Sequence, residues 1–277
     1  MQAQNLTISI PNAGCLKNCP YCISKMTGYT KSNEALMLRN FPKVMTTARA
    51  AGVTSVLLTG KGEPLCGMQS TLMWVKRVSA SFGNYQYHCE LQTNGRGLNQ
   101  NKIDVLQANG LNVIAFSFDK LSDFEEHARS AAYIRKRGMI TRASLNITDM
   151  LPKDTCFKDI LRLTKKYGYH QLTLRDITVP TGLRRTKDAK AAAAWIKKHT
   201  NKKRFEELVA QLRVTAKGRV IRTLPYGATV YDIQDIAVTA FDYCVQDANN
   251  NNDIRNLIYA EDGHLYTAWN SEASILF

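Results

Sequence analysis

Residues 6–22 read LTISIPNAGCLKNCPYC, a short β-branched run followed at once by three closely spaced cysteines. The run predicts a strand, which places Cys15, Cys19 and Cys22 on the loop after its carboxyl end. Soft thiolates crowded on one loop favour zinc or an iron–sulfur cluster. A structural zinc site takes four ligands, whereas a four-iron cluster held by three cysteines leaves one iron open. A zinc site completed by a distant histidine or cysteine is the alternative.

Up to residue 180, short apolar runs alternate with longer amphipathic stretches, the pattern of repeated βα units around a parallel sheet. The predicted strands are Leu6 to Ile10, Val53 to Thr59, Tyr85 to Gln92, Val113 to Phe118, Thr141 to Ile147 and Gln171 to Val179. Helices are predicted near Asn33 to Ala51, Ser70 to Ser81, Lys102 to Asn109, Ser122 to Arg137 and Cys156 to Tyr167, and glycines suited to left-handed helix ends are Gly52, Gly110, Gly138 and Gly168. The pattern predicts an α/β fold with an open, partial (β/α)6 barrel.

The pattern changes after Pro180. An alanine- and lysine-rich segment from Asp188 to Leu212 predicts one or two exposed helices, and residues 219–232 and 256–267 predict irregular or antiparallel strands. Asp262-Gly263 is the expected turn of a hairpin between Ile258-Tyr259 and Leu265-Tyr266. We therefore expect two parts, a barrel core over residues 1–180 and, over residues 181–277, a basic helical segment with a short C-terminal α+β extension.

Composition excludes several classes of protein. A chain of 277 residues with 44% apolar residues can bury a large core. It has no apolar run near the roughly 18 residues that span a bilayer, and residues 1–14 lack the pattern of a secretory signal. The expected location is therefore cytoplasmic. The formal net charge is +14, and residues 184–222 alone hold thirteen basic residues against three acidic ones, which favours an anionic partner.

Further polar residues stand at the predicted strand ends. The carboxyl ends of parallel barrel strands build the active site, so these residues are functional candidates, although each alone could be only a loop or helix cap. The sequences at these ends are Thr59-Gly60-Lys61-Gly62-Glu63-Pro64-Leu65, Gln92-Thr93-Asn94-Gly95 and Ser117-Phe118-Asp119, with Ser144 and Asn146 on the fifth strand and Arg175 on the sixth.

Together these motifs resemble the radical S-adenosylmethionine (SAM) enzymes over about residues 6–180. The Cys-x3-Cys-x2-Cys loop, with Tyr21 before its last cysteine, is similar to the signature loop of that superfamily. The turn at residues 60–64 is similar to its Gly-Gly-Glu-Pro element in a Gly-x-Gly-Glu-Pro form, and Thr93-Asn94-Gly95 resembles its Thr-Asn-Gly element. In layout the chain is most similar to small biosynthetic members that act on purine nucleotides or pterins.

The resemblance implies one 4Fe-4S cluster and SAM as cofactors. It implies that Cys15, Cys19 and Cys22 bind the cluster and that the Gly-x-Gly-Glu-Pro turn binds the amino group of SAM. The other residues expected near SAM are Tyr21, Thr93, Asn94, Ser117, Asp119, Ser144 and Asn146. It also implies a flavodoxin or ferredoxin as the electron donor. The C-terminal tail is similar to one that holds a second cluster in related enzymes, but Ala268-Trp269 stands where a cysteine is expected and only Cys244 is near, so we expect no second cluster.

Two further sets of residues are candidates for contact with the substrate. Cys66 follows the Glu63-Pro64 turn, where a thiol facing a cavity can donate a hydrogen atom to a radical product; the alternative is a small apolar filler. Arg175, Arg184 and Arg185 are expected at the barrel mouth, where they would meet a phosphate, with the lysine-rich helix lying further out. Trp195 within that helix is expected to be a packing residue.

The predicted function is therefore reductive cleavage of SAM to a 5'-deoxyadenosyl radical that abstracts hydrogen from an anionic substrate, of the nucleotide type and small. Three alternatives remain open at this point. They are a radical SAM enzyme that modifies nucleic acid, an activase that makes a glycyl radical on a partner protein, and a non-enzymatic metal-binding module that contacts nucleic acid. No membrane partner is expected.

Overall fold

The structure is a computed structural model that describes residues 2–11, 13–83, 87–180, 182–224, 228–241, 254–269 and 271–277. Its first six strands are β1 (Ala3–Ser9), β2 (Ser55–Thr59), β3 (His88–Thr93), β4 (Val113–Phe118), β5 (Ile140–Ile147) and β6 (Gln171–Asp176). The helices among them are α1 (Ile23–Thr27), α2 (Glu34–Ala50), η1 (Pro64–Gly67), α3 (Met68–Phe82), α4 (Gln100–Ala108), α5 (Ser122–Glu126), α6 (Ala128–Lys136) and α7 (Phe157–Lys166).

The remaining elements follow β6. They are α8 (Lys187–His199), α9 (Lys202–Ala216), β7 (Val220–Thr223), β8 (Thr229–Ile233), β9 (Ile236–Phe241), β10 (Ile254–Tyr259), β11 (Leu265–Tyr266) and η2 (Glu272–Ser274).

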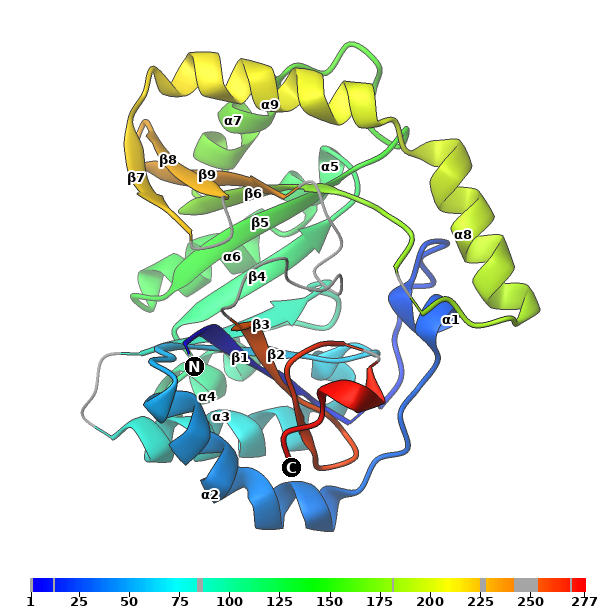
Figure 1. Cartoon of the computed structure of the whole chain (residues 1–277). Helices are drawn as coiled ribbons and strands as arrows, with labels where there is room; N and C mark the ends of the chain where they lie inside the picture. The colour runs from blue at the N-terminus through cyan, green and yellow to red at the C-terminus, as the bar shows by residue number, and fades with distance from the viewer. Residues whose placement is uncertain are drawn as a thin grey trace.

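The fold is a curved, open α/β barrel, which confirms the predicted class (Figure 1). Strands β1 to β6 pair in chain order and all run parallel. All six predicted strands are present, although residues 85 and 86 of the third prediction lie outside the described ranges. The four glycines expected to end helices have φ between 73° and 103°, the left-handed region that lets them turn the chain into the next strand.

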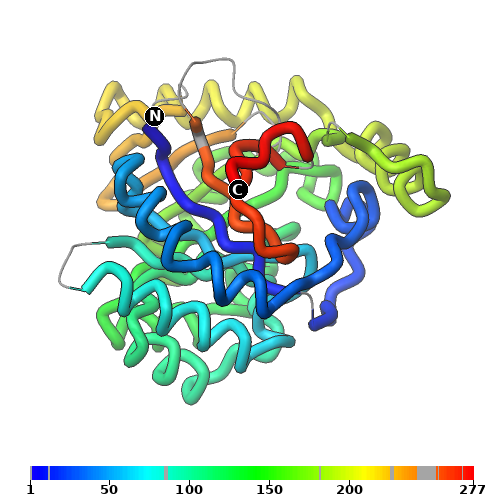
Figure 2. Tube along the Cα trace, turned by 60° about the horizontal axis from the view of Figure 1, so that its bottom comes forward, coloured from blue at the N-terminus to red at the C-terminus, as the bar shows by residue number. Residues whose placement is uncertain are grey.

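The sheet is longer than the sequence predicted, because strands from the last quarter of the chain extend it at both ends. β9 pairs in parallel with β6, from Gln171 beside Ala237 to Arg175 beside Phe241. β10 pairs in parallel with β1, and the two strands run side by side in Figure 2. The full order is β11-β10-β1-β2-β3-β4-β5-β6-β9-β8-β7.

The expectation that residues 256–267 form only irregular or antiparallel strands is therefore wrong for β10. Its parallel partner β1 lies about 250 residues earlier, so no local pattern could reveal the pairing. The predicted hairpin is confirmed, because β11 is antiparallel to β10 with Ile258 beside Tyr266 and Tyr259 beside Leu265. β7 and β8 are antiparallel, as predicted.

The main core lies between the sheet and the helices on its outer side. Trp74 of α3 is fully buried and packs edge-on against Phe41 of α2 and Tyr259 of β10. Because Tyr259 belongs to the C-terminal strand, residues beyond 181 contribute to the same core as the barrel. No helix in the described ranges combines the length and the apolarity that crossing a membrane requires.

Candidate active site

The cysteine loop connects β1 to α1, and Cys22 directly precedes that short helix. All three thiols are free; Cys15 is exposed, and Cys19 and Cys22 are half-buried. Around the Cys15 sulfur, the backbone N–H of Lys17 lies at 3.4 Å and the Asn94 side-chain amide at 3.6 Å. Such N–H groups beside thiolate sulfur are typical of iron–sulfur sites.

The donor set fits a cluster with one open iron, since it offers three soft thiols on one loop and two of them line the central cavity. In the part of the chain that the structure describes, no three such ligands already converge as a metal site. Burial raises the pKa of the Cys19 thiol to about 11, with Lys17 opposing that shift.

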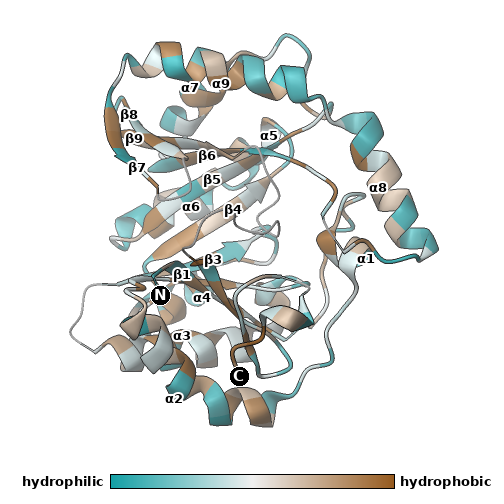
Figure 3. Ribbon diagram, in the orientation of Figure 1, coloured by the Kyte–Doolittle hydropathy of each residue, from teal (hydrophilic) through white to brown (hydrophobic). Residues whose placement is uncertain are grey.

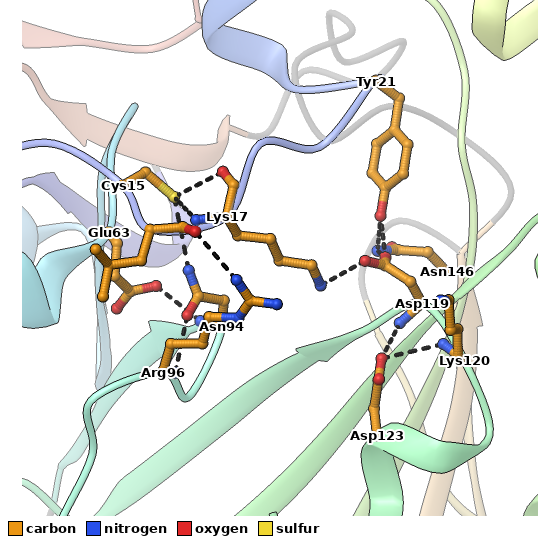
Figure 4. A network of polar contacts seen from close by, with 11 residues as sticks. Cys15, Lys17, Tyr21, Glu63, Asn94, Arg96, Asp119, Lys120, Asp123 and Asn146 are labelled. Atoms are coloured by element: carbon orange, nitrogen blue, oxygen red, sulfur yellow. Dashed lines mark hydrogen bonds and ion pairs between the residues drawn. The ribbon is translucent and has the colours of Figure 1, made fainter. Parts of the chain in front are cut away.

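A network of polar contacts joins the loop to the ends of β4 and β5 (Figure 4). Asp119 accepts hydrogen bonds from Tyr21 Oη and from Asn146 Nδ2 and forms an ion pair with Lys17. Asn146 Nδ2 also lies 3.0 Å from Tyr21 Oη. Burial and the neighbouring Asp119 carboxylate raise the pKa of Tyr21 far above its usual value, so the phenol stays protonated and remains a donor.

Asp119 does not cap the helix that follows it. The backbone N–H groups of Asp119 and Lys120 donate to Asp123 Oδ2, at 2.7 and 3.0 Å. Asp123 therefore satisfies the backbone before α5, and the Asp119 carboxylate faces the cysteine loop instead (Figure 4). The alternative that Asp119 only starts the next helix is wrong.

The Gly-x-Gly-Glu-Pro turn is fastened to two neighbouring segments through Glu63. The Glu63 carboxylate is 4% exposed and accepts from Leu65 N at 3.1 Å, Thr93 Oγ1 at 2.6 Å and Asn94 N at 2.8 Å. Its backbone N–H donates to Gly14 O, just before the first cysteine, at 2.8 Å. One residue thus aligns the turn, the Thr-Asn-Gly element and the cysteine loop.

Gly60 needs to be glycine because of a close backbone approach. A Cβ at this position would lie 2.8 Å from Ile10 O. Because Ile10 O is a backbone atom, no side-chain rotation could relieve this clash. The turn consequently runs against the end of β1, close to the start of the cysteine loop. Gly60 and Lys61 line the central cavity, whereas Gly62, Glu63 and Pro64 surround a separate small void beside it.

The central cavity has a volume of about 850 Å³ and runs along the inside of the barrel. One end meets Cys19, Tyr21 and Cys22, and the other reaches His88 and Val113 at the amino ends of their strands. Its size is at the upper end of the roughly 300–1,000 Å³ of small-molecule sites. The cavity therefore has room for more than one small ligand.

Charged side chains cross the interior of the barrel. Arg142 Nη1 of β5 lies 2.5 Å from Glu90 Oε2 of β3, and Arg142 Nε donates to Gln171 Oε1 of β6 at 2.7 Å. Glu90, Arg142 and Lys61 line the cavity, yet the sequence motifs did not select them. Polar residues that recur at every second position of otherwise apolar strands were the available signal for Glu90 and Arg142.

The other predicted residues divide between the cavity and the surface. Ser117 and Arg175 line the cavity, as does Trp269. Ser144 Oγ is buried and lacks a hydrogen-bond partner among the described residues. Cys66 is exposed, Arg184 and Arg185 are exposed on the connection from β6 to α8, and Cys244 lies outside the described residues.

The structure gives α8 a contact that the sequence did not predict. Its apolar face packs on α1 and the cysteine loop. Arg184 N donates to Met26 O of α1 at 2.9 Å, which brings the start of this segment to the same place. Trp195 does pack, as predicted, and its partner is Tyr21.

The sequence profile of the Radical SAM superfamily matches residues 9–175. Because the match covers more than half of the chain, the protein belongs to this superfamily, whose members are enzymes that use a 4Fe-4S cluster and SAM. Membership confirms the predicted class of enzyme and both cofactors, and it excludes the non-enzymatic alternative.

Individual relatives are more distant. A probable dual-specificity RNA methyltransferase RlmN of Desulforudis audaxviator (strain MP104C) is 36% identical over 72 residues, which make up 25% of this chain and 22% of that protein. SuiB of Streptococcus suis, solved with its precursor peptide SuiA, has a TM-score of 0.62 at 13% identity over 96% of this chain and 60% of SuiB. The enzyme anSMEcpe, solved with AdoMet and the Kp18Cys peptide, has a TM-score of 0.64 at 12% identity over 99% of this chain and 77% of that one. These structural similarities establish the fold.

Proposed function

We propose that this radical SAM enzyme acts on a small anionic substrate of the nucleotide type, bound in the central cavity below the cysteine loop. The observation that carries the proposal is the charge of the cavity wall. Among the described residues, the basic side chains that line it are Lys61, Arg142, Arg175 and Arg222, and the acidic ones are Glu90 and Asp176. The excess of positive charge on the wall of this cavity favours an anion.

The position of each site residue suggests which part of the two cofactors it would contact. Cys15, Cys19 and Cys22 would hold the cluster, and the turn at residues 60–64 would receive the amino group of SAM. Tyr21, Ser117, Asp119 and Asn146 would border the nucleoside portion, with Thr93, Asn94 and Ser144 beside them. When bound, the cluster and SAM supply a 5'-deoxyadenosyl radical that removes a hydrogen atom from the substrate.

The remaining proposals concern the substrate side and the electron supply. Arg175 would meet the substrate anion from within the cavity, with Arg184 and Arg185 at its mouth. Cys66 is exposed outside the cavity wall, so a role as hydrogen donor would require η1 to move. A flavodoxin or ferredoxin would reduce the cluster from the exposed side of the cysteine loop. The barrel walls would orient the reacting groups.

The test is anaerobic incubation of reconstituted protein with SAM, dithionite and a panel of nucleoside mono- and triphosphates. We expect one phosphorylated compound to stimulate formation of 5'-deoxyadenosine, and Arg175→Gln to abolish the stimulation while leaving the slow uncoupled cleavage of SAM. The uncoupled rate is the matched control, because it reports an intact cluster and SAM site. If uncharged nucleosides stimulate as well as their phosphates, the anionic substrate is wrong.

A second candidate is modification of RNA, favoured by the similarity to RlmN and by the basic surface of α8 and α9. Lys197, Lys198, Lys202 and Lys203 are exposed, and Figure 3 shows hydrophilic residues along both helices. Arg204 is only half-buried but donates to Pro152 O and Thr155 O, so it is engaged within the protein.

The dependence of binding on salt separates the two candidates. A polynucleotide gripped by these lysines releases counterions, so log affinity should fall with log salt by about 0.7 to 0.9 per phosphate contact. A single nucleotide in the cavity should show a shallow slope that survives neutralisation of residues 197, 198, 202, 203 and 204. We expect the shallow slope. A slope of about three or more for RNA, flattened by the five-site variant, would make RNA the substrate.

A further inference from the structure

Helix α8 stands beside the cysteine loop at the edge of the molecule (Figure 1). Its buried residues Ala192 and Ile196 form a small apolar cluster with Met26 of α1, separate from the main core. Tyr21, Ile23 and Trp195 pack against this cluster from the loop, α1 and α8, respectively. The cysteine loop therefore has an apolar core of its own, and α8 supplies one wall of it.

Apart from Ile177 and Val179 after β6, which pack against the same cluster, the described links from the loop to the barrel are polar. Lys17 and Tyr21 contact Asp119, Ser24 Oγ donates to Lys61 O, and Arg96 Nη1 donates to Leu16 O at 3.1 Å. Hydrogen bonds fix direction, but each adds little net stability in a partly exposed setting. The apolar cluster, to which α8 contributes Ala192, Trp195 and Ile196, thus adds apolar burial to this loop.

Trp195 is the central contact of α8 with the signature loop. Its ring centroid lies 5.2 Å from that of Tyr21 at an interplanar angle of 34°, and 4.4 Å from that of His199 at 19°. Tyr21 in turn reaches Asp119 and Asn146 through its hydroxyl. A line of three rings therefore connects the end of α8 to the residue that precedes Cys22.

The carboxyl end of α8 is anchored to the segment after β5, so the helix can resist movement of the loop. At its carboxyl end, His199 Nδ1 lies 2.7 Å from Asp149 Oδ2, and Asp149 N donates to His199 O at 2.9 Å. Ahead of its amino end, Arg184 N donates to Met26 O. Asp149 follows β5 in the chain, so α8 spans from the barrel rim to α1.

We propose that Trp195 is a positioning residue that braces the cysteine loop through its stack on Tyr21, holding the loop close to the shape needed to bind the cluster. The proposal rests on the assignment of the cluster to Cys15, Cys19 and Cys22. The proposal gives α8, the first helix of the basic segment, a role in the radical SAM site. The superfamily motifs all lie within the barrel and do not include this helix. A loop without this support would lose more freedom on binding the metal.

The first test uses the metal-free protein and amide hydrogen exchange. In Trp195→Ala, we expect amides of residues 13–29 to exchange about tenfold faster than in the wild type. Exchange requires the loop to open locally, and in this variant the opening no longer has to break the stack of Trp195 on Tyr21. Trp195→Phe keeps an aromatic ring in place and should exchange like the wild type. The matched control is Leu208→Ala, which opens a space under α9 in the main core and should lower the thermal midpoint without changing exchange in the loop.

The second test uses the reconstituted holoenzyme. Iron should pass to a competing chelator several-fold faster from Trp195→Ala than from the wild type or Trp195→Phe. Unchanged loop exchange in Trp195→Ala would overturn the proposal. So would a loss of SAM affinity in Trp195→Phe with normal loop exchange, since that result would make Trp195 a direct SAM contact. If Trp195→Ala does not fold, Trp195→Leu takes its place, with the same expectation of faster exchange confined to the loop. Wild-type protein that binds no iron would refute the cluster assignment, whatever the exchange result.

Discussion

Replacing Cys15, Cys19 and Cys22 together by alanine will abolish iron binding and SAM cleavage. The wild-type protein, reconstituted without oxygen, should hold about four irons per chain, as a cuboidal cluster held by cysteines requires. The triple variant should hold almost none, because no other three potential ligands converge within the described residues. Iron and sulfide analysis and the yield of 5'-deoxyadenosine under dithionite measure the effect.

The matched control replaces cysteines outside the loop. Cys66→Ala, Cys156→Ala and Cys244→Ala should each retain the cluster. Cys89→Ser is less suitable as a control, because Cys89 is a fully buried core residue and the substitution would disturb packing. Burial also raises the pKa of its thiol to about 12. Stoichiometric zinc without iron in the wild type would contradict the expectation. The circular dichroism spectrum of the triple variant should match that of the metal-free wild type.

Glu63→Ala will destabilise the protein and weaken SAM binding together. The substitution removes one carboxylate that accepts from Leu65 N, Thr93 Oγ1 and Asn94 N, and it leaves buried donors without an acceptor. The expected loss of unfolding free energy is on the order of 3 kcal/mol. SAM affinity should fall as well, because the Gly-x-Gly-Glu-Pro turn and the Thr-Asn-Gly element lose their alignment. Urea unfolding and calorimetric titration with SAM measure the two effects.

Glu63→Gln distinguishes alignment from charge. Its amide oxygen can still accept from Thr93 Oγ1, but its NH2 group would face a second donor, the backbone N–H of Asn94. We therefore expect intermediate stability and intermediate SAM affinity. If SAM binding falls as far in Glu63→Gln as in Glu63→Ala while stability is normal, the carboxylate charge itself serves SAM, and alignment is not its main role.

The sequence could predict the position of the site, because that information is local. A β-branched run followed by Cys15, Cys19 and Cys22 places three thiols after a strand, and this inference does not depend on the structure of the rest of the chain. Glycines and polar residues after strands β2, β3 and β4 mark the same edge of a parallel sheet for the same reason. The structure brings Tyr21, Asp119 and Asn146 into contact at that edge, and all three were selected from the sequence.

What those residues contact could not be predicted. Glu63 was selected for its charge toward SAM, yet its carboxylate is occupied by Leu65 N of the same turn and by two donors about 30 residues further along the chain. Arg142 and Glu90 belong to different strands, and only the register of β3, β4 and β5 brings them to one layer of the barrel. Such pairings depend on sheet curvature and register, which leave no mark in a short window of sequence.

By itself, then, the sequence determined most of the local elements: six strands, the longer helices between them, the cysteine loop and the turns at the strand ends. These follow from residue periodicity, glycine conformation and motif spacing, each of which acts over a few residues. Only the tertiary structure decided that β10 lies beside β1, that β9 lies beside β6 and that Trp195 of α8 lies on Tyr21. These contacts join residues between about 65 and 250 positions apart. They form because folding of the whole chain buries the apolar surface of one segment against that of another.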